Sequence, residues 1–380
     1  MLRTVYHSSL AEGNSGGYHL ISMSAILVLN AGSSSLKFAL YDGGNPPLRH
    51  ASGKLERTAG LEPALRQAQS TGQTIGAVGH RIVHGGPTYF EPTRITPEVI
   101  AELRRLSPFD PEHLPAEVEL IEAVEKKLPG VPQVACFDTA FHRDLPDVSR
   151  ILPIPWRYER LGVRRYGFHG LSYASVVEQL EREGLRGRMI LAHLGSGASL
   201  AAVHDGKCID TTMAFTPASG IPMSSRSGDL DPGLYPYLAR TEGMTPDQWN
   251  HMVHTQSGIQ GISGSSKSVQ QLVDFEGENP RFGLALRMFC YHVRKAIGAT
   301  AAALGGVDVL AFSGGIGENS ASIRSTICSE LGFLGIELDS RRNSENGPAI
   351  SSVGARVQVR VIRTDEELQI ARSTRHLVEL

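Results

Sequence analysis

The segment Ala25–Lys37 reads AILVLNAGSSSLK and gives the clearest indication of the fold class. Its first five residues are apolar and form a short run that is typical of a buried strand. The run passes through Asn30 into small residues, so we expect the strand to end in a turn with little side-chain bulk. The backbone N–H groups of such a turn can approach an anion closely, which makes it a candidate anion-binding loop.

Two later apolar runs, Met189–Ala192 and Val307–Phe312, also lead into glycine-rich turns. The turn residues are His193, Leu194, Gly195, Ser196 and Gly197 after the first run, and Gly314, Gly315, Ile316, Gly317, Glu318 and Asn319 after the second. The chain therefore offers three loops in which a backbone without bulky side chains can surround an anion.

The first two segments are also related to each other. A gapless displacement of 163 residues lays Ile26–Gly43 on Met189–Gly206, and both segments read as strand, small-residue turn, alternating strand and Asp-Gly turn. An Asp-Gly pair after an alternating run is typical of a hairpin. We interpret the match as an ancestral duplication that gives two similar α/β domains, each presenting a loop to a common cleft. Chance similarity in a chain rich in glycine and alanine is the alternative.

Helical patterns lie between the strand-like runs, and strands that alternate with helices predict mixed sheets covered by helices. Apolar residues recur at helical spacing in Pro97–Leu106, Ala116–Leu128, Ser172–Glu183 and Phe282–Leu304. At 380 residues the chain is about twice the size of an ordinary domain, so we expect two. We predict a disordered extension over 1–22, a first domain from 23–150 plus 368–380, and a second domain from 151–367.

The composition limits the classes of function. Lys and Arg number 37 against 39 Asp and Glu, so a net charge of -2 leaves no basic field for a nucleic-acid backbone. The apolar runs are far shorter than the ~20 residues of a membrane span, and residues 1–22 lack the apolar core of a signal peptide. The four cysteines form no C-x-x-C pair, which fits buried side chains in a reducing compartment. We therefore expect a cytoplasmic protein without nucleic-acid or membrane partners.

Five further clusters have an unusual density of polar residues. They are HRIVHGG at 80–86, FDTAFH at 137–142, RRYGFHG at 164–170, FTP with SRSGD within 215–229, and TDEEL at 364–368. Each cluster alone is more simply interpreted as a turn or a solvated charge. Together, arginines, histidines, a few carboxylates and anion-binding loops are the groups that phosphoryl transfer requires. The chain has no P-loop motif and no protein-kinase loop set, so those two classes of kinase are excluded.

These clusters, together with VLNAGSSSLK at Val28–Lys37, HLGSG and FSGGIGEN, resemble the acetate kinase family in sequence and in order. The resemblance spans nearly the whole chain from residue 25. It implies two duplicated domains of the actin-like ATPase (ribonuclease H-like) fold with a cleft between them, as in sugar kinases, Hsp70-type chaperones and actin. It also implies transfer of a phosphoryl group from ATP to acetate, with Mg²⁺ or Mn²⁺, by a homodimer.

The resemblance further implies a role for each matched residue. The catalytic positions are Arg81, Asp138, His169 and Arg226, and the acetate-binding positions are Arg81, Val83, His113, Phe168 and Pro217. Lys37 and the two later glycine-rich turns, His193–Gly197 and Gly314–Asn319, match the ATP-binding positions. Asn30 and Glu366 match the positions that help to place the metal.

The chemistry of a carboxylate acceptor agrees with those roles. A carboxylate with a pKa around 4 to 5 is already ionised at pH 7, so it needs no general base. Asp138 is therefore better interpreted as orienting an arginine or the metal's water. The obstacle is the approach of two anions, because two unit charges 4 Å apart repel by ~4 kcal/mol at an effective dielectric of ~20. We expect Arg81 and Arg226 to converge and cancel that repulsion, and His169 to bind the phosphoryl oxygens.

Three segments depart from the family pattern. Asp110–Pro115 aligns with the family's Ala-Pro-Leu-His-Asn-Pro and keeps His113, but Glu112 stands where an apolar pocket residue is usual. Either Glu112 points outward or the acyl substrate differs, because a buried carboxylate beside a methyl group is costly. The family's Thr-Ser-His after Phe-His-Gly is here Leu171–Tyr173. The adenosine-side Asp-x-Arg is replaced near Ser265–Val269, which leaves the base and ribose preference open.

Two other functions therefore remain possible from the sequence. One is a kinase for another short-chain carboxylate, such as propionate or butyrate, or one that uses a phosphoryl donor other than ATP. The other is an ATP-gated binding module of the Hsp70 kind. Such a module should carry a separate client-binding domain, for which this chain has no remaining residues.

Overall fold

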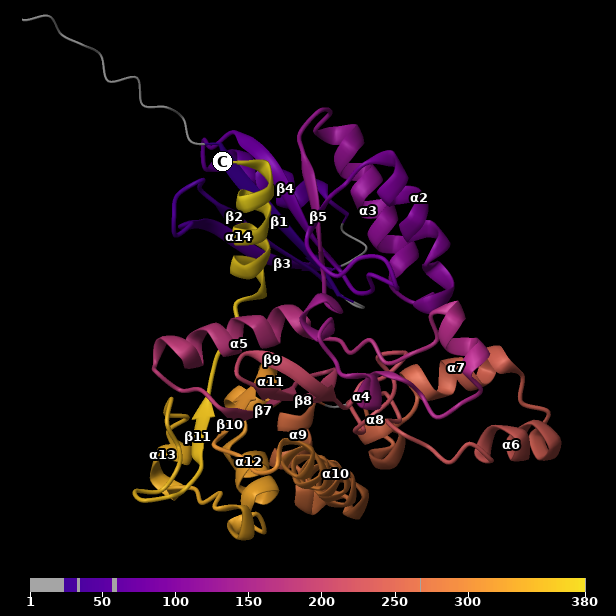
Figure 1. Ribbon diagram of the computed structural model, residues 1–380. Coiled ribbons are helices and arrows are strands. Elements are labelled where there is room, and N and C mark those ends of the chain that lie inside the picture. Colours follow the sequence, from indigo (N-terminus) through magenta and orange to yellow (C-terminus); the bar gives the residue numbers. More distant parts are fainter. Residues whose placement is uncertain (1–23, 33–34, 57–59, 267, 380) are drawn as a thin grey trace, which may run out of the picture.

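The molecule consists of two mixed β-sheets, one above the other in Figure 1, with helices on their faces. The computed structural model describes residues 24–32, 35–56, 60–266 and 268–379. The predicted disordered extension over 1–22 lies outside the described residues. The predicted α/β class with two mixed sheets is confirmed.

The first sheet is built around the opening segment of the chain. Its strands are β1 (Ala25–Ala31), β2 (Ser35–Tyr41), β3 (Arg49–Glu56), β4 (Ile75–Ile82), β5 (Thr93–Arg94) and β6 (Gln133–Phe137), in the order β3-β2-β1-β4-β6-β5. β1 pairs antiparallel with β2 and parallel with β4. The predicted strand residues Ala25–Leu29 are fully buried, as expected for an apolar run with both faces covered.

The second sheet repeats this arrangement. Its strands are β7 (Arg188–Leu194), β8 (Ala198–His204), β9 (Lys207–Thr211), β10 (Val309–Ser313) and β11 (Gln358–Val361), in the order β11-β10-β7-β8-β9. β7 pairs antiparallel with β8 and parallel with β10, as β1 does with β2 and β4. The displacement of 163 residues lays β1 on β7 and β2 on β8 from end to end. The predicted duplication is therefore confirmed in the topology.

The helices follow the predicted pattern closely. They are α1 (Glu62–Ser70), α2 (Pro97–Arg105), α3 (Leu114–Lys127), α4 (Asp147–Arg150), α5 (Gly170–Arg182), α6 (Leu234–Glu242), α7 (Pro246–Thr255), α8 (Gly258–Ser263), α9 (Val269–Asp274), α10 (Pro280–Leu304), α11 (Gly314–Asn319), α12 (Ala321–Cys328), α13 (Ser340–Ser344) and α14 (Glu366–Val378). The four helices expected from periodicity are α2, α3, α5 and α10, each correct to within two residues at both ends. α10 stops at Gly305, whose φ of 67° is left-handed and favours glycine.

Two helices, α14 (Glu366–Val378) and α5 (Gly170–Arg182), pack against the sheets next to the candidate site. α14 returns to the first sheet, where Ile370 and Ala371 share a core with Ile26 and Val28 of β1. α5 lies between the two sheets (Figure 1), and it places Leu171 in that same core and Tyr173 in the core of the second sheet. The division of the chain into domains at 150/151 and 367/368 stays a prediction.

Two expectations from composition can also be compared with the structure. All four cysteines are buried and free. None of the helices in the described part of the chain is both long and apolar enough to cross a membrane.

Candidate active site

Two adjoining cavities collect most of the predicted site residues. The smaller cavity has a volume of about 150 Å³ and is lined by all the predicted catalytic and acyl-side residues, namely Arg81, Val83, His113, Asp138, Phe168, His169, Pro217 and Arg226. The larger cavity has a volume of about 1080 Å³. Gly32, directly after β1, lines both cavities, so the two adjoin at this turn.

Arg81 and Asp138 form an ion pair on one wall of the smaller cavity. Arg81 lies near the end of β4 and Asp138 directly after β6, and these strands are parallel neighbours whose carboxyl ends meet. Arg81 donates from Nε to Asp138 Oδ2 over 3.0 Å and from Nη1 to the carbonyl of Ala31 over 2.9 Å. Burial alone would lower the pKa of Arg81, but the carboxylates of Asp138 and Glu366 raise it above its ordinary value. The guanidinium is therefore a fixed cation.

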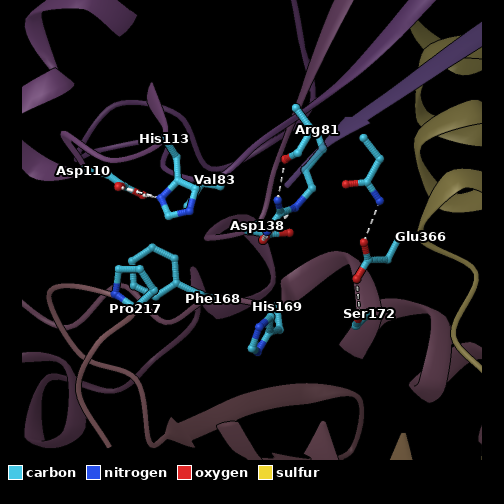
Figure 2. A network of polar contacts seen from close by, with 12 residues as sticks. Arg81, Val83, Asp110, His113, Asp138, Phe168, His169, Ser172, Pro217 and Glu366 are labelled. Carbon is cyan, nitrogen blue, oxygen red and sulfur yellow. Dashed lines mark hydrogen bonds and ion pairs between the residues drawn. The ribbon is translucent and has the colours of Figure 1, made fainter. Parts of the chain in front are cut away.

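Glu366 is held at the start of α14, on the other side of Asp138 from the acyl-side residues (Figure 2). Asn30 Nδ2 donates to Glu366 Oε2 over 2.8 Å, and the hydroxyl of Ser172 donates to Glu366 Oε1. Burial acts to raise the pKa of Glu366, but the charge of Arg81, the ring of His193 and the hydrogen bonds from Ser172 and Asn30 together outweigh it, and the pKa falls to about 2. Glu366 is thus an ionised carboxylate at neutral pH. Asn30 lines neither cavity and reaches the site through Glu366.

The residues around Glu366 suit a hard divalent cation. Asp138 Oδ1 is buried and has no hydrogen-bond partner of normal geometry among the described residues, while the backbone amide of Leu171 lies close enough to lower the pKa of this carboxyl. Mg²⁺ prefers oxygen ligands and is commonly held by one or two carboxylates together with phosphate oxygens. Among the described residues no group of three or more His, Cys, Asp and Glu side chains could hold a metal ion alone. The donor set therefore fits an ion that a phosphate ligand helps to hold.

Arg226 supplies a second cation to the smaller cavity and follows the strands of the second sheet in the chain, whereas Arg81 lies on the first sheet. It lies on the loop between β9 and α6, where Nη1 donates to the carbonyl of Pro217 over 3.2 Å. Burial lowers the pKa of Arg226, and the nearby charge of Arg81 acts in the same sense. Within the described part of the chain Arg226 forms no ion pair with a carboxylate. A buried guanidinium without a carboxylate is a site prepared for an anionic ligand.

His169 lies at the junction of the two sheets, directly before α5. Its backbone is left-handed, with a φ of 59°, and its Nδ1 is 2.8 Å from the hydroxyl of Ser199 on β8. A methyl group added to Gly197 would lie 3.1 Å from His169 Nε2 and 3.4 Å from Arg226 Nη1. Gly197 therefore keeps open the space onto which an imidazole and a guanidinium both point.

The acyl side of the smaller cavity is mainly apolar. Figure 2 shows Val83, His113, Phe168 and Pro217 together on this side, with Asp138 next to them. Val83 and Phe168 are only 3% and 1% exposed, so their presence in the lining makes the wall rigid and apolar. His113 Nδ1 is 2.9 Å from Asp110 Oδ1, which fixes the imidazole ring.

Glu112 does not contribute to this wall. Its side chain is exposed, and Glu112 Oε1 accepts a hydrogen bond of 3.2 Å from Asn250 on α7. Of the two explanations that the sequence left open, the outward orientation of Glu112 is the correct one.

The larger cavity is lined by most of the predicted nucleotide-binding residues. These are Lys37, His193, Gly195, Ser196, Gly314, Gly315, Ile316, Glu318 and Asn319, together with Glu366. Three predicted residues lie elsewhere: Gly197 lines the smaller cavity, and Leu194 and Gly317 line neither. Leu194 points into the core of the second sheet, as alternation along β7 requires.

The structure also places residues in the site that the sequence did not indicate. Lys54 lines the larger cavity and lies directly opposite Lys37 in the antiparallel pairing of β2 and β3. Like charges opposite each other destabilise a sheet, so this pair indicates an anion nearby. Only the strand register, which the sequence does not reveal, could have identified Lys54.

The segment near Ser265–Val269 does border the nucleotide-sized cavity. Ser265, Ser266, Ser268 and Val269 line it, followed by Gln270 and Gln271, while Lys267 lies outside the described residues. Hydroxyl and amide groups therefore stand where the family pattern has Asp-x-Arg.

Comparisons with known proteins agree with this geometry. The chain matches the model of the Acetokinase family over residues 51–372. It is 42% identical to a propionate kinase of Citrobacter rodentium, with 91% of this chain and 95% of the relative covered. It is 41% identical to an acetate kinase of Microcystis aeruginosa, with 93% and 99% covered.

Solved structures give the same result. A propionate kinase from Francisella tularensis superposes with a TM-score of 0.87 at 32% identity, covering 93% of this chain and 100% of that one. The acetate kinase of Porphyromonas gingivalis superposes with a TM-score of 0.82 at 37% identity and the same coverage. By sequence, by fold and by the residues around the two cavities, the chain belongs to the acetokinase family.

Proposed function

We propose that the protein is an acetate kinase, which transfers a phosphoryl group reversibly and in line from ATP to acetate, giving ADP and acetyl phosphate. The observation that carries this proposal is the position of Arg81 and Arg226, which line one small cavity that adjoins a nucleotide-sized one. The family membership supports a phosphotransferase with a carboxyl group as acceptor. It also argues against the Hsp70-type binding module.

In the proposed mechanism the residues of the smaller cavity stabilise negative charge, and none of them acts as a general acid or base. The acceptor carboxylate is ionised at neutral pH and attacks without a general base. Arg81 and Arg226 offset its repulsion from the phosphoryl group, and His169 Nε2 is positioned to contact the phosphoryl oxygens. Asp138 keeps the fork of Arg81 aimed at the cavity through Oδ2. This leaves the proposed role of Asp138 as a positioning one.

A divalent cation, Mg²⁺ or Mn²⁺, completes the proposed site. Glu366, oriented by Asn30, and Oδ1 of Asp138 would hold it beside the donor phosphates. When bound, the cation would neutralise phosphate charge that the two arginines do not reach.

The size of the cavity favours a small acceptor. The volume of about 150 Å³ is small beside the nucleotide-sized cavity of about 1080 Å³, which favours an acceptor of a few heavy atoms. The outward orientation of Glu112 removes the main objection to acetate. Relatives at about 40% identity are named acetate kinase or propionate kinase, so propionate is the competitor to test first.

We further propose that the enzyme acts in the cytoplasm as a homodimer, with ATP and a short-chain carboxylate as substrates and with no nucleic-acid or membrane partner. We also propose that residues 23–150 with 368–380, and residues 151–367, move as two domains and close over the substrates. Closure would shield the acyl phosphate from water.

An acyl hydroxamate assay tests the function. Purified protein with Mg-ATP and hydroxylamine is given acetate, propionate or butyrate, and ATP is replaced in parallel by GTP or pyrophosphate. The proposal expects the highest kcat/KM with acetate and ATP. A preference for another acid or donor would select the alternative kinase, and ATP hydrolysis without any hydroxamate would overturn the proposal.

A further inference from the structure

We propose that Tyr173 and Ser199 form a buried hydroxyl relay that holds His169 in the tautomer with its proton on Nε2. A neutral imidazole would then donate an N–H bond to the transferring phosphoryl group. Tyr173 and Ser199 are positioning residues in this proposal, since neither lines the cavity. The target of the Nε2–H bond rests on the proposed function, whereas the tautomer itself does not.

The three side chains come from elements that the fold brings together. Tyr173 lies on the first turn of α5, four residues after His169, and its amide donates to the carbonyl of His169 over 3.0 Å. Ser199 lies on β8, where its Oγ is 2.8 Å from His169 Nδ1 and 2.6 Å from the hydroxyl of Tyr173. Tyr173 and Ser199 are both fully buried. Bulk water therefore cannot replace a missing partner in this chain of contacts.

The number of protons and acceptors fixes the direction of the relay. The hydroxyl of Tyr173 is fully buried, so its proton needs an acceptor within the protein. Among the described residues the acceptor within hydrogen-bond distance is Ser199 Oγ. A buried phenol proton without an acceptor would be costly, so Tyr173 donates to Ser199.

The serine proton then determines the state of the imidazole. Having accepted from Tyr173, Ser199 has one proton left, and His169 Nδ1 is 2.8 Å away. If Ser199 donates to Nδ1, that nitrogen carries no proton, and the neutral ring must carry its proton on Nε2. In the opposite tautomer Ser199 Oγ would accept from both Nδ1 and Tyr173, and its own buried proton would be left without an acceptor among the hydrogen-bond partners that the described residues offer it.

The surroundings of His169 keep the ring neutral. The groups that face it are the ring of His193, with centroids 4.4 Å apart, the guanidiniums of Arg81 and Arg226, and the buried His142. Burial first, and then these neighbours, lower the pKa of His169 well below its ordinary value. A neutral donor binds a phosphoryl oxygen without adding a third positive charge to the cavity.

The proton on Nε2 would point into the reacting region. Nε2 lies close above Gly197, next to Arg226 Nη1, and all three residues line the smaller cavity. A tautomer with the proton on Nδ1 would instead present a lone pair to the phosphoryl oxygens, which repel it. The relay therefore decides whether His169 attracts or repels the transferring group.

The test uses two variants that remove one hydroxyl each, Ser199→Ala and Tyr173→Phe, with Ser199→Thr as the variant that keeps the hydroxyl. Protein with ¹⁵N-labelled histidine rings is studied by NMR without substrates, and the His169 signals are assigned from their loss in His169→Gln. We expect protonated Nε2 and unprotonated Nδ1 in the wild type and in Ser199→Thr. We expect a mixture of tautomers in the two hydroxyl-deleting variants.

Kinetics supply the second readout. We expect kcat to fall about tenfold in Ser199→Ala and Tyr173→Phe, with unchanged KM for both substrates and recovery in Ser199→Thr. A wild-type proton on Nδ1, or an unchanged tautomer and kcat in both deletions, would overturn the relay. Failure of the proposed function would appear differently, as the expected tautomers in a protein without acetate-dependent turnover.

Discussion

Replacement of Arg226 tests the electrostatic basis of the proposed mechanism. Two anions 4 Å apart repel by ~4 kcal/mol at an effective dielectric of ~20, which corresponds to about 10³-fold in rate. Arg226 has no carboxylate partner among the described residues, so its charge is available to offset that repulsion. We expect Arg226→Gln to lower kcat by about three orders of magnitude.

The lysine variant separates charge from geometry. Arg226→Lys keeps the positive charge but loses the donor to the carbonyl of Pro217 and the planar fork. We expect a loss in kcat of about a hundredfold, with a small change in the KM for ATP, because the larger cavity is untouched. Arg81→Lys should lose more, since it also breaks the paired contact with Asp138.

The measurement is initial-rate hydroxamate formation over a matrix of acetate and ATP concentrations. Arg240→Lys on the exposed face of α6 is the matched control, and it should leave kcat and both KM values unchanged. Circular dichroism establishes that each variant is folded. Near-normal turnover in Arg226→Lys and Arg81→Lys would refute the requirement for two guanidinium forks.

Three further substitutions probe single features. Burial raises the pKa of Glu117 from its ordinary value of 4.5 to about 8, so between these two pH values the folded protein holds a proton that the unfolded chain has released. The free energy of unfolding, measured with urea, should therefore fall by up to about 5 kcal/mol as the pH rises from 4.5 to 8. Glu117→Gln should remove that slope, and parallel pH profiles would contradict the assignment. Lys54→Gln should raise the KM for ATP about two- to fivefold at low salt and leave the KM for acetate unchanged; an effect that persists in 0.5 M salt would exclude a screened charge contact. Gly197→Ala should lower kcat at least tenfold by displacing His169 Nε2, whereas Gly298→Ala in α10, with open space at its Cβ, should not; equal activity of the two variants would be the contrary result.

Local patterns in the sequence predicted most of the fold because this fold repeats its opening unit. The apolar run Ala25–Leu29 and its counterpart in β7 both form central strands, and the Asp-Gly turn at Asp205 forms a hairpin as expected. The corresponding turn at Asp42 instead opens a longer loop, where its carboxylate accepts the amides of Gly44 and Leu48. The same dipeptide therefore predicts a reversal of the chain but not the length of the loop.

Site residues that lie within a sequence motif could be predicted. Site residues whose contacts depend on the packing of two distant elements were missed. Arg81 and Asp138 could be identified from their clusters. Tyr173 and Ser199 could not, because their contact depends on how α5 is placed over β8. Lys54 was missed for a similar reason, since only the register of β3 sets it opposite Lys37.

The orientation of Glu112 is set by the turn before α3, which the sequence resemblance does not reveal. Helical hydrogen bonds begin before α3 itself, since the amide of Leu114 donates to the carbonyl of Asp110 and that of Glu117 to the carbonyl of His113. Residues 111–113 form the turn that leads into α3, and in this turn Glu112 is exposed whereas His113 is buried. The buried polar side chains of this segment are those of Asp110, His113 and Glu117.

The acidic residues of this segment that contact residues of the smaller cavity are therefore Asp110 and Glu117, and not Glu112. Asp110 holds the ring of His113, and Glu117 accepts the amide of Val83, so both acids act on residues that line the smaller cavity. Substitution of Glu112 should leave acceptor selectivity unchanged, because its contact with Asn250 lies outside the cavity. If Glu112→Leu nevertheless shifted the ratio of kcat/KM for acetate and propionate, the closed enzyme would have to bring this side chain inward.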